Sequence, residues 1–166
     1  MQFKRLLQYK NIVHCYTLKE NLNFRGASPI KQESIENICN VLKLDNEKFI
    51  MAEQEHTKNI AIINSGDEDL ENIDGLVTDK KGFVLASKSA DCTSLLMYDP
   101  IKNVVASVHS GWRGTVKKIA VEAVNKMVEN YECNPQDIIC CICPSIRKCH
   151  FEVDEDVKEL FENTFK

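Results

Sequence analysis

Residues 91–115 of the chain read DCTSLLMYDPIKNVVASVHSGWRGT, and the prediction of the fold begins with this segment. It holds two apolar runs, residues 94–98 and 104–108, which are separated by an Asp-Pro turn signal. Such a pair of runs predicts a β-hairpin over residues 93–109. In residues 115–128 the apolar side chains recur every three or four positions, which is typical of one face of a helix.

Outward from the hairpin, the rest of the chain mixes further helices and strands. We predict helices at residues 31–43 and 154–165, and strands at residues 11–16, 60–63, 83–87 and 138–143. The last of these strands is continuously apolar, which predicts burial of both its faces. Because the elements do not follow a strict βαβ alternation, the pattern favours an α+β fold. No repeat or Pro/Gly-rich linker divides the chain, so we predict a single domain over residues 1–166.

The composition of the chain argues against a nucleic-acid partner and a membrane partner. The net charge is −4 and no Lys/Arg cluster is present, which argues against a nucleic-acid partner. No apolar stretch reaches membrane-spanning length, and the first ten residues do not resemble a signal peptide, so we expect a cytoplasmic protein with no membrane partner. The eight cysteines lack the spacings of a disulfide framework, and we expect them to be reduced and mostly buried.

His56, Cys92 and His109 form a candidate metal site. The predicted hairpin would bring Cys92 and His109 to its open end, whereas His56 precedes another predicted strand. Two imidazoles and one thiolate are a known zinc set that leaves the fourth tetrahedral position open for water. The alternative interpretation is a buried core cysteine and two histidines that lie on the surface or outside a metal's own ligand set, so that the three residues bind no common metal ion.

Other polar residues near this candidate site have weaker signals. Asp74 and Asp91 are candidates to orient a ligating imidazole, or are ordinary turn residues. Arg113 lies in the glycine-flanked segment 110–115, which could bind an anion such as phosphate. The alternative is a tight turn with an exposed arginine that binds nothing. A metal cluster on Cys140, Cys141, Cys143 and Cys149 is not the first choice, because the neighbouring side chains of Cys140 and Cys141 on a strand would point to opposite faces.

Five blocks of the sequence, in order, resemble the YfiH family, also called the peptidoglycan editing factor, laccase-domain or multicopper polyphenol oxidoreductase family. The blocks are Gln-Glu-His at 54–56, Asp-Gly-Leu-Val-Thr at 74–78, Ala-Asp-Cys-Thr-Ser-Leu-Leu at 90–96, Val-His-Ser-Gly-Trp-Arg-Gly-Thr at 108–115, and Pro-Ser-Ile to Cys-His-Phe-Glu-Val at 144–153. The resemblance implies an α/β/β/α sandwich with mixed sheets. It also implies a zinc site on His56, Cys92 and His109, with copper as a second metal that the site can take.

The family resemblance further implies chemistry on purine nucleosides: phosphorolysis of adenosine, inosine, guanosine and methylthioadenosine, and deamination of adenosine. Its older label is laccase-like polyphenol oxidation, and bacterial members are linked to editing of peptidoglycan precursors. The chain has four histidines and no His-x-His pair, too few ligands for the copper sites of a conventional laccase.

Three functional hypotheses remain open at this point. The first is a zinc-dependent purine nucleoside enzyme that binds a nucleoside and phosphate, acts through Cys92, His109, Asp91 and Arg113, and is a monomer or weak homodimer. The second is a hydrolase in which Cys92 and His109 form a thiolate–imidazole pair. The third is an inactive binding module, because family members continue for several elements beyond the position of Lys166.

Overall fold

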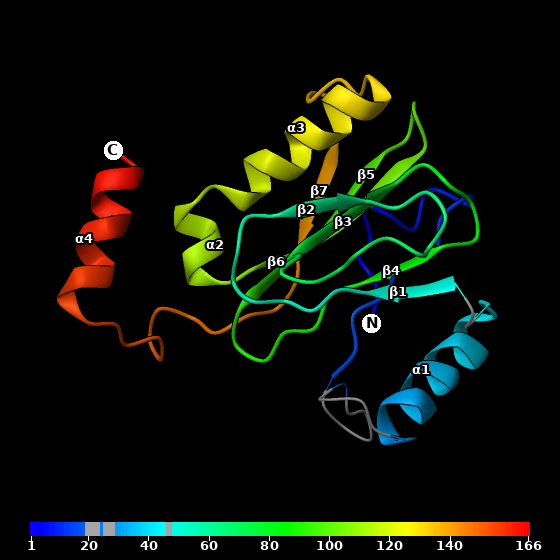
Figure 1. Cartoon of the computed structure of the whole chain (residues 1–166), viewed down its shortest axis with the longest axis horizontal. Coiled ribbons are helices and arrows are strands. Elements are labelled where there is room, and N and C mark those ends of the chain that lie inside the picture. The colour runs from blue at the N-terminus through cyan, green and yellow to red at the C-terminus, as the bar shows by residue number, and fades with distance from the viewer. Residues whose placement is uncertain (19–23, 25–28, 46–47) are drawn as a thin grey trace.

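The predicted hairpin lies at the centre of the fold in the computed structural model, which describes residues 1–18, 24, 29–45 and 48–166 (Figure 1). One five-stranded sheet has the order β2-β3-β6-β5-β7, and a small parallel sheet pairs β1 with β4. The strands are β1 (Phe49–Met51), β2 (Ile60–Ile62), β3 (Gly75–Thr78), β4 (Val84–Ala86), β5 (Thr93–Asp99), β6 (Val104–Ser110) and β7 (Ile139–Ile142). The helices are α1 (Pro29–Leu42), α2 (Trp112–Val116), α3 (Ile119–Tyr131) and α4 (Glu155–Thr164).

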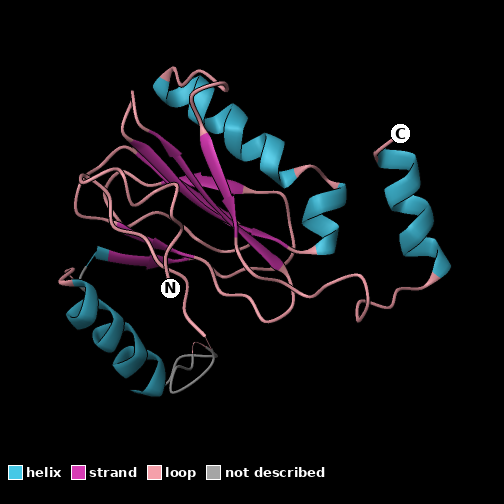
Figure 2. Cartoon of the chain, turned by 180° about the vertical axis from the view of Figure 1, so that it is seen from behind, coloured by secondary structure: helices cyan, strands magenta, loops and turns pink. Residues whose placement is uncertain are grey.

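The five-stranded sheet carries a different layer on each of its two faces. Helix α3 covers one face, and the small β1–β4 sheet lies on the other side, with α1 beyond it (Figures 1 and 2). The core under α3 consists of ten buried side chains: Val77, Leu95, Met97, Val104, Ala106, Val108, Ile119, Ala123, Met127 and Cys133. A second core between the two sheets contains Ile50, Ala52, Ile63 and Leu76.

The α+β class with mixed sheets is confirmed. Strand β2 runs parallel to β3, whereas β3 and β5 are antiparallel to β6. In the part of the chain that the structure describes, no helix combines the length and the apolar character needed to cross a membrane.

The hairpin predicted over residues 93–109 is formed by β5 and β6. Thr93 pairs with Ser110, and Asp99 pairs with Val104. The turn is closed by Asp99, whose Oδ1 accepts hydrogen bonds from the backbone N–H groups of Ile101 and Lys102 at 2.8 and 3.0 Å. This register places the segment before β5 next to the carboxyl end of β6, where His109 lies.

The single helix predicted at residues 115–128 is instead two helices, α2 and α3. The break lies at Lys118, whose φ of 62° is in the left-handed region and cannot continue a right-handed helix. The apolar periodicity remained in phase across the break, so it predicted the buried face of α3 but not where the helix begins.

The strand predicted at residues 11–16 is wrong. The segment forms no strand pairing, and it hydrogen-bonds to the first residues of the chain: Tyr16 N–H donates to the Met1 carbonyl, and the Phe3 N–H donates to His14 Nε2. Of its apolar side chains, Ile12 packs against the cluster of Leu6, Tyr98 and Cys141, whereas Val13 is exposed.

Strand β7 is formed as predicted, but the prediction that both of its faces are buried is wrong. It is the edge strand beside β5, with Cys141 buried and Ile142 66% exposed. Cys140 is also exposed, on the face opposite Cys141. All eight cysteines are free thiols as expected, but only Cys39, Cys133 and Cys141 are buried, so the expectation of mostly buried cysteines is wrong.

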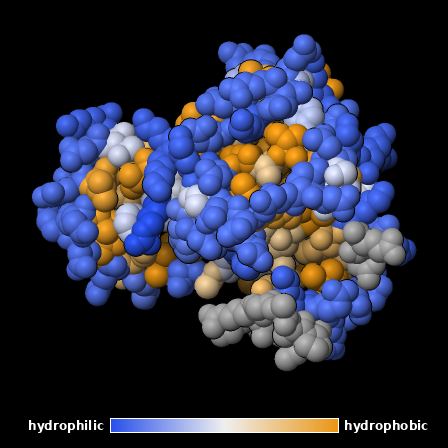
Figure 3. Space-filling view, viewed as in Figure 1, coloured by the Kyte–Doolittle hydropathy of each residue, from blue (hydrophilic) through white to orange (hydrophobic). Residues whose placement is uncertain are grey.

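Helix α4 is present close to its predicted bounds but packs only at the periphery. It lies beside α2, apart from the sheet (Figure 1). Its apolar side chains gather on the face seen at the left of Figure 3, and Leu160 and Phe165 are 45% and 54% exposed. The helix therefore contributes little to either core.

Glu68 provides a stability test that depends on pH. Its carboxylate accepts hydrogen bonds from the backbone N–H groups of Asn64, Ser65 and Gly66 at 2.7 to 2.9 Å. Burial raises the pKa of Glu68, but these hydrogen bonds outweigh it and lower the pKa from 4.5 to about 2. A lowered folded-state pKa stabilises the fold above the unfolded-state value, and that contribution is lost as the pH falls from 4.5 towards 2.

Glu68→Gln is therefore expected to lower the free energy of unfolding by about 1 kcal/mol at pH 7, after allowance for solvent screening. The difference from the parent chain should shrink as the pH falls below 4.5. Urea unfolding at pH 7 and pH 3 measures both values, with Asp67→Asn as a control that removes a charge from the same turn. An equal deficit at both pH values would contradict the assignment to the ionised carboxylate.

Candidate metal centre

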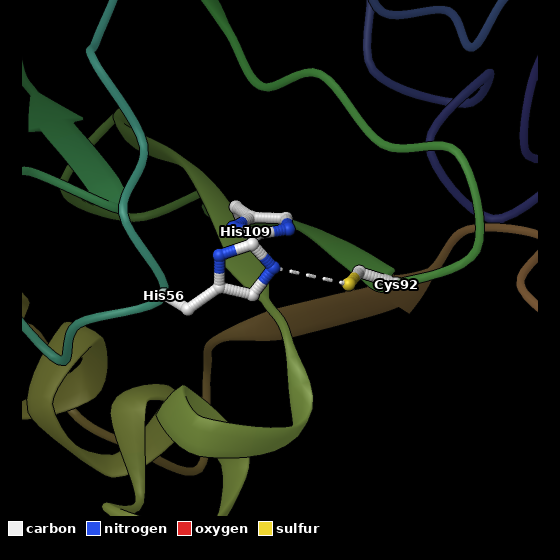
Figure 4. Close-up of side chains that lie close together, drawn as sticks. All are labelled: His56, Cys92 and His109. Carbon is white, nitrogen blue, oxygen red and sulfur yellow. Dashed lines mark hydrogen bonds between the residues drawn. The ribbon is translucent and has the colours of Figure 1, made fainter.

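The fold brings together the three residues that the sequence proposed as a metal set. His56 lies in the loop between β1 and β2, Cys92 directly precedes β5, and His109 is near the end of β6. One potential ligand atom from each lies within 4.8 Å of the other two (Figure 4). Within the described ranges, this is the one group of three or more His, Cys, Asp or Glu side chains so arranged.

The spacing of these side chains fits a tetrahedral ion. Cys92 Sγ lies 3.6 Å from His56 Nε2 (Figure 4). Two ligands at the usual Zn–S and Zn–N lengths, subtending a tetrahedral angle, are separated by about 3.6 Å. The imidazoles of His56 and His109 meet edge to face, with ring centroids 4.9 Å apart and an interplanar angle of 81°. The donor set and its spacing therefore suit zinc, and the thiolate also suits a softer copper ion.

Asp74 holds the ring of His109 through the nitrogen Nδ1. The backbone N–H of His109 donates to the Asp74 carbonyl at 2.7 Å, which places the two residues side by side where β3 and β6 pair. Asp74 Oδ1 then lies 2.7 Å from His109 Nδ1. With Nδ1 engaged, Nε2 is the nitrogen left to act as a ligand.

The electrostatics of this pair favour a neutral imidazole. Burial lowers the pKa of His109, and the hydrogen bond and negative charge of Asp74 offset this only in part. Burial raises the pKa of the Asp74 carboxyl, but the hydrogen bonds that it accepts from His109, Thr57 and Glu55 hold it below its usual value. Asp74 is thus an ionised acceptor, and a metal ligand must be an unprotonated imidazole nitrogen.

The loop that carries His56 is attached to the same carboxylate. Asp74 accepts the backbone N–H groups of Glu55, His56 and Thr57 at 3.2, 3.0 and 2.7 Å, and the Thr57 hydroxyl at 2.8 Å. His56 has a φ of 61°, a left-handed conformation that L residues adopt rarely and that needs such support. The contact arises because β2 and β3 are parallel, so the segments that precede the two strands lie at the same end of the sheet.

Gly111 leaves the space that the His56 ring occupies. A Cβ atom built at Gly111 would lie 2.4 Å from His56 Cδ2. The residue precedes α2 with φ −65° and ψ 165°, an extended conformation open to any residue. Contact with His56, and not backbone freedom, is therefore what requires glycine here. The sequence alone did not indicate this role of Gly111 or the hydrogen bonds of Thr57, although Thr57 follows His56 and Gly111 lies two residues after His109.

The Cys92 thiol lies in a negative environment. Burial raises its pKa, and the charges of Asp91 and Asp74 raise it further. A thiol of this kind remains protonated near neutral pH unless a cation lies beside it. The surroundings of Cys92 therefore suit a cation site better than an isolated nucleophile.

Asp91 and Arg113 are both exposed. Asp91 is exposed, and its carbonyl accepts the N–H of Ile146. Arg113 is exposed on α2, with its guanidinium carbon 4.3 Å from the centroid of the Trp112 ring. Neither side chain is among the potential ligands that the structure brings together.

The family profile described as "Multi-copper polyphenol oxidoreductase laccase" matches residues 27–166 of the chain. The human protein named purine nucleoside phosphorylase LACC1 is 28% identical over 157 residues, which are 95% of this chain and 36% of the relative. Purine nucleoside phosphorylase YlmD of Bacillus subtilis is 34% identical over 133 residues, which are 75% of this chain and 48% of the relative. A protein named adenosine deaminase RL5, from an unknown prokaryote, is 34% identical over 130 residues, with coverages of 73% and 49%.

Two solved structures are similar to the chain in fold. Bacillus licheniformis YfiH, a hypothetical protein, superposes with a TM-score of 0.78 at 30% identity over 82% of this chain and 54% of that chain. Geobacillus stearothermophilus YlmD superposes with a TM-score of 0.81 at 26% identity over 88% and 58%. The chain thus spans little more than half the length of these solved relatives. With the five sequence blocks and the fold in agreement, the chain belongs to the YfiH family of laccase-like domains.

Proposed function

We propose that the chain is a zinc-dependent enzyme of purine nucleosides. The observation that carries the proposal is the convergence of His56, Cys92 and His109, one potential ligand atom of each lying within 4.8 Å of the others. The names of several relatives support the substrate class, since they are called purine nucleoside phosphorylases or, in one case, an adenosine deaminase. Zinc is preferred to copper because a single Cys/His₂ site is a zinc set, and a conventional laccase needs more imidazoles than the four histidines of this chain.

His56, Cys92 and His109 would hold the ion. A zinc ion with three protein ligands supplies Lewis-acid activation of water at neutral pH. The protein orients this centre through Asp74, which is 1% exposed and holds one ring and one loop in place.

Exposed or partly exposed residues close in sequence to the proposed ligands would supply the substrate contacts. Arg113, stacked on Trp112, presents the edges of its guanidinium group to a phosphate, and Trp112 offers an indole beside the site for a purine base. Asp91, which is exposed and adjacent to Cys92 in the sequence, would move a proton between bulk water and the site. In phosphorolysis the base leaves as free purine while phosphate bonds to the ribose anomeric carbon. In deamination water replaces the amino group, which leaves as ammonia.

The test measures metal and products together. The purified 166-residue chain is analysed for zinc and then incubated with adenosine, with and without phosphate. Adenine with ribose 1-phosphate reports phosphorolysis, and inosine with ammonia reports deamination. Turnover that is lost on chelation and restored by zinc is expected. A metal-loaded chain with neither activity on adenosine, inosine, guanosine or methylthioadenosine would overturn the proposal and favour a binding module.

A second candidate function, a thiol hydrolase acting on peptidoglycan precursors, rests on the 3.6 Å contact between Cys92 Sγ and His56 Nε2. The imidazole partner in this contact is His56, and not His109 as the sequence hypothesis had it. Rapid alkylation of Cys92 by iodoacetamide that persists in excess zinc would favour this function. Protection of Cys92 by zinc is expected if the thiol is a ligand.

A further inference from the structure

Asp74 is the point at which two of the three proposed ligands are joined. Its Oδ1 contacts His109 Nδ1 at 2.7 Å and accepts the His56 N–H at 3.0 Å. Its Oδ2 accepts the N–H and the hydroxyl of Thr57 at 2.7 and 2.8 Å. The side chain is completely buried, so water cannot replace these bonds.

An ionised carboxylate has only acceptor atoms, and this fixes the direction of every bond at this position. The backbone N–H groups of the 55–57 loop can only donate. His109 must likewise donate through Nδ1, and the second ring nitrogen, Nε2, then keeps its lone pair. A carboxamide of the same shape would present an NH₂ group to one of its partners, and facing Nδ1 it would move the ring proton to Nε2.

We infer that Asp74 is a positioning residue that preforms the metal centre, because it sets the tautomer of His109 and the backbone of His56 with one carboxylate. The inference rests on the metal centre of the proposed function and deepens it. It does not involve Asp74 as a ligand, since both oxygens are occupied by hydrogen bonds from the protein. Outer contacts of this kind change metal affinity by about 10- to 100-fold in other metal sites.

Two measurements test the inference, and the first requires no metal. Long-range ¹H–¹⁵N spectra of the metal-free parent chain are expected to show His109 protonated at Nδ1, and those of Asp74→Asn to show the proton at Nε2. Zinc affinity, measured by competition with a chromogenic chelator, is expected to be 10- to 100-fold weaker in Asp74→Asn. Asp99→Asn is the matched control, because Asp99 is another buried carboxylate that accepts backbone N–H groups, at the hairpin turn.

Asp99→Asn is expected to change the stability of the fold while leaving both the His109 signal and the zinc affinity as in the parent. A parent spectrum with the proton on Nε2, or an Asp74→Asn chain that binds zinc as tightly as the parent, would overturn the inference. If Asp74→Asn does not fold, Thr57→Val tests the loop by removing only one hydroxyl from the carboxylate. A severalfold loss of zinc affinity with an unchanged His109 signal is expected, and unchanged affinity overturns the inference. Failure of the parent chain to bind zinc would instead overturn the proposed function.

Discussion

Cys92→Ala is expected to reduce bound zinc from about one ion per chain to almost none, because two imidazoles alone hold zinc weakly. Nucleoside turnover should fall by more than roughly 100-fold, since the change removes a direct ligand and not an outer contact. Elemental analysis of the purified protein and the adenosine assay measure the two effects. The fold should persist, because Cys92 is only half-buried and belongs to neither core around the five-stranded sheet.

Two other cysteines provide matched controls for that result. Cys140 and Cys149 are exposed thiols outside the cluster, so their replacement by alanine should leave zinc content and turnover at the parent values. Zinc retained at full stoichiometry in Cys92→Ala would refute the ligand assignment. A loss of turnover with zinc retained would point to the thiol as a nucleophile.

The hairpin and the α+β class could be predicted from local sequence, whereas the choice of His56, Cys92 and His109 as a metal set depended on the resemblance of five sequence blocks to a known family. The Asp-Pro turn and the apolar runs on either side predict the hairpin, and its register in the structure pairs Thr93 with Ser110. That register brings Cys92 to the same end as His109. Helix α3 was predicted in the same way, because the apolar period of its buried face is local.

The remaining elements depend on pairing that local sequence does not contain. Strands β1 and β3 were not predicted as separate elements, although β3 is fully buried between β2 and β6. The segment at 11–16 has the composition of a strand, but its hydrogen bonds go to the first residues of the chain. The same limit applies at Lys118, where one left-handed residue ends a helix that the apolar pattern would continue.

Within the site, the sequence predicted which residues meet but not what holds them. Asp74 was one of two candidate carboxylates, and only the parallel pairing of β2 and β3 brings it beneath the 55–57 loop. Asp91 was the other candidate carboxylate, and it is exposed to solvent. The hydrogen bond from His56 to Asp74 and the contact of the His56 ring with Gly111 are long-range features, so no pattern around any one of these residues could indicate them.

Gly111→Ala tests that long-range contact and should weaken zinc binding by more than roughly 100-fold, because it displaces a direct ligand. The added methyl group would lie 2.4 Å from His56 Cδ2, closer than two carbon atoms can approach. The ring must therefore move away, and the left-handed loop that carries it is already held by Asp74 and cannot follow freely. The backbone at Gly111 accepts alanine without strain, so the free energy of unfolding of the metal-free chain should change little.

Gly82→Ala gives the opposite pattern and completes the test. Gly82 has a φ of 88°, and its nearest neighbouring atom is the flexible Lys48 side chain at 3.6 Å. Alanine there strains the backbone and should lower stability by about 1 to 2 kcal/mol without touching the metal site. Chelator competition and urea unfolding on both variants separate the effects. If Gly111→Ala bound zinc as tightly as Gly82→Ala, the ring of His56 would not need its observed position. His56 would then be no ligand, and the centre would reduce to Cys92 and His109.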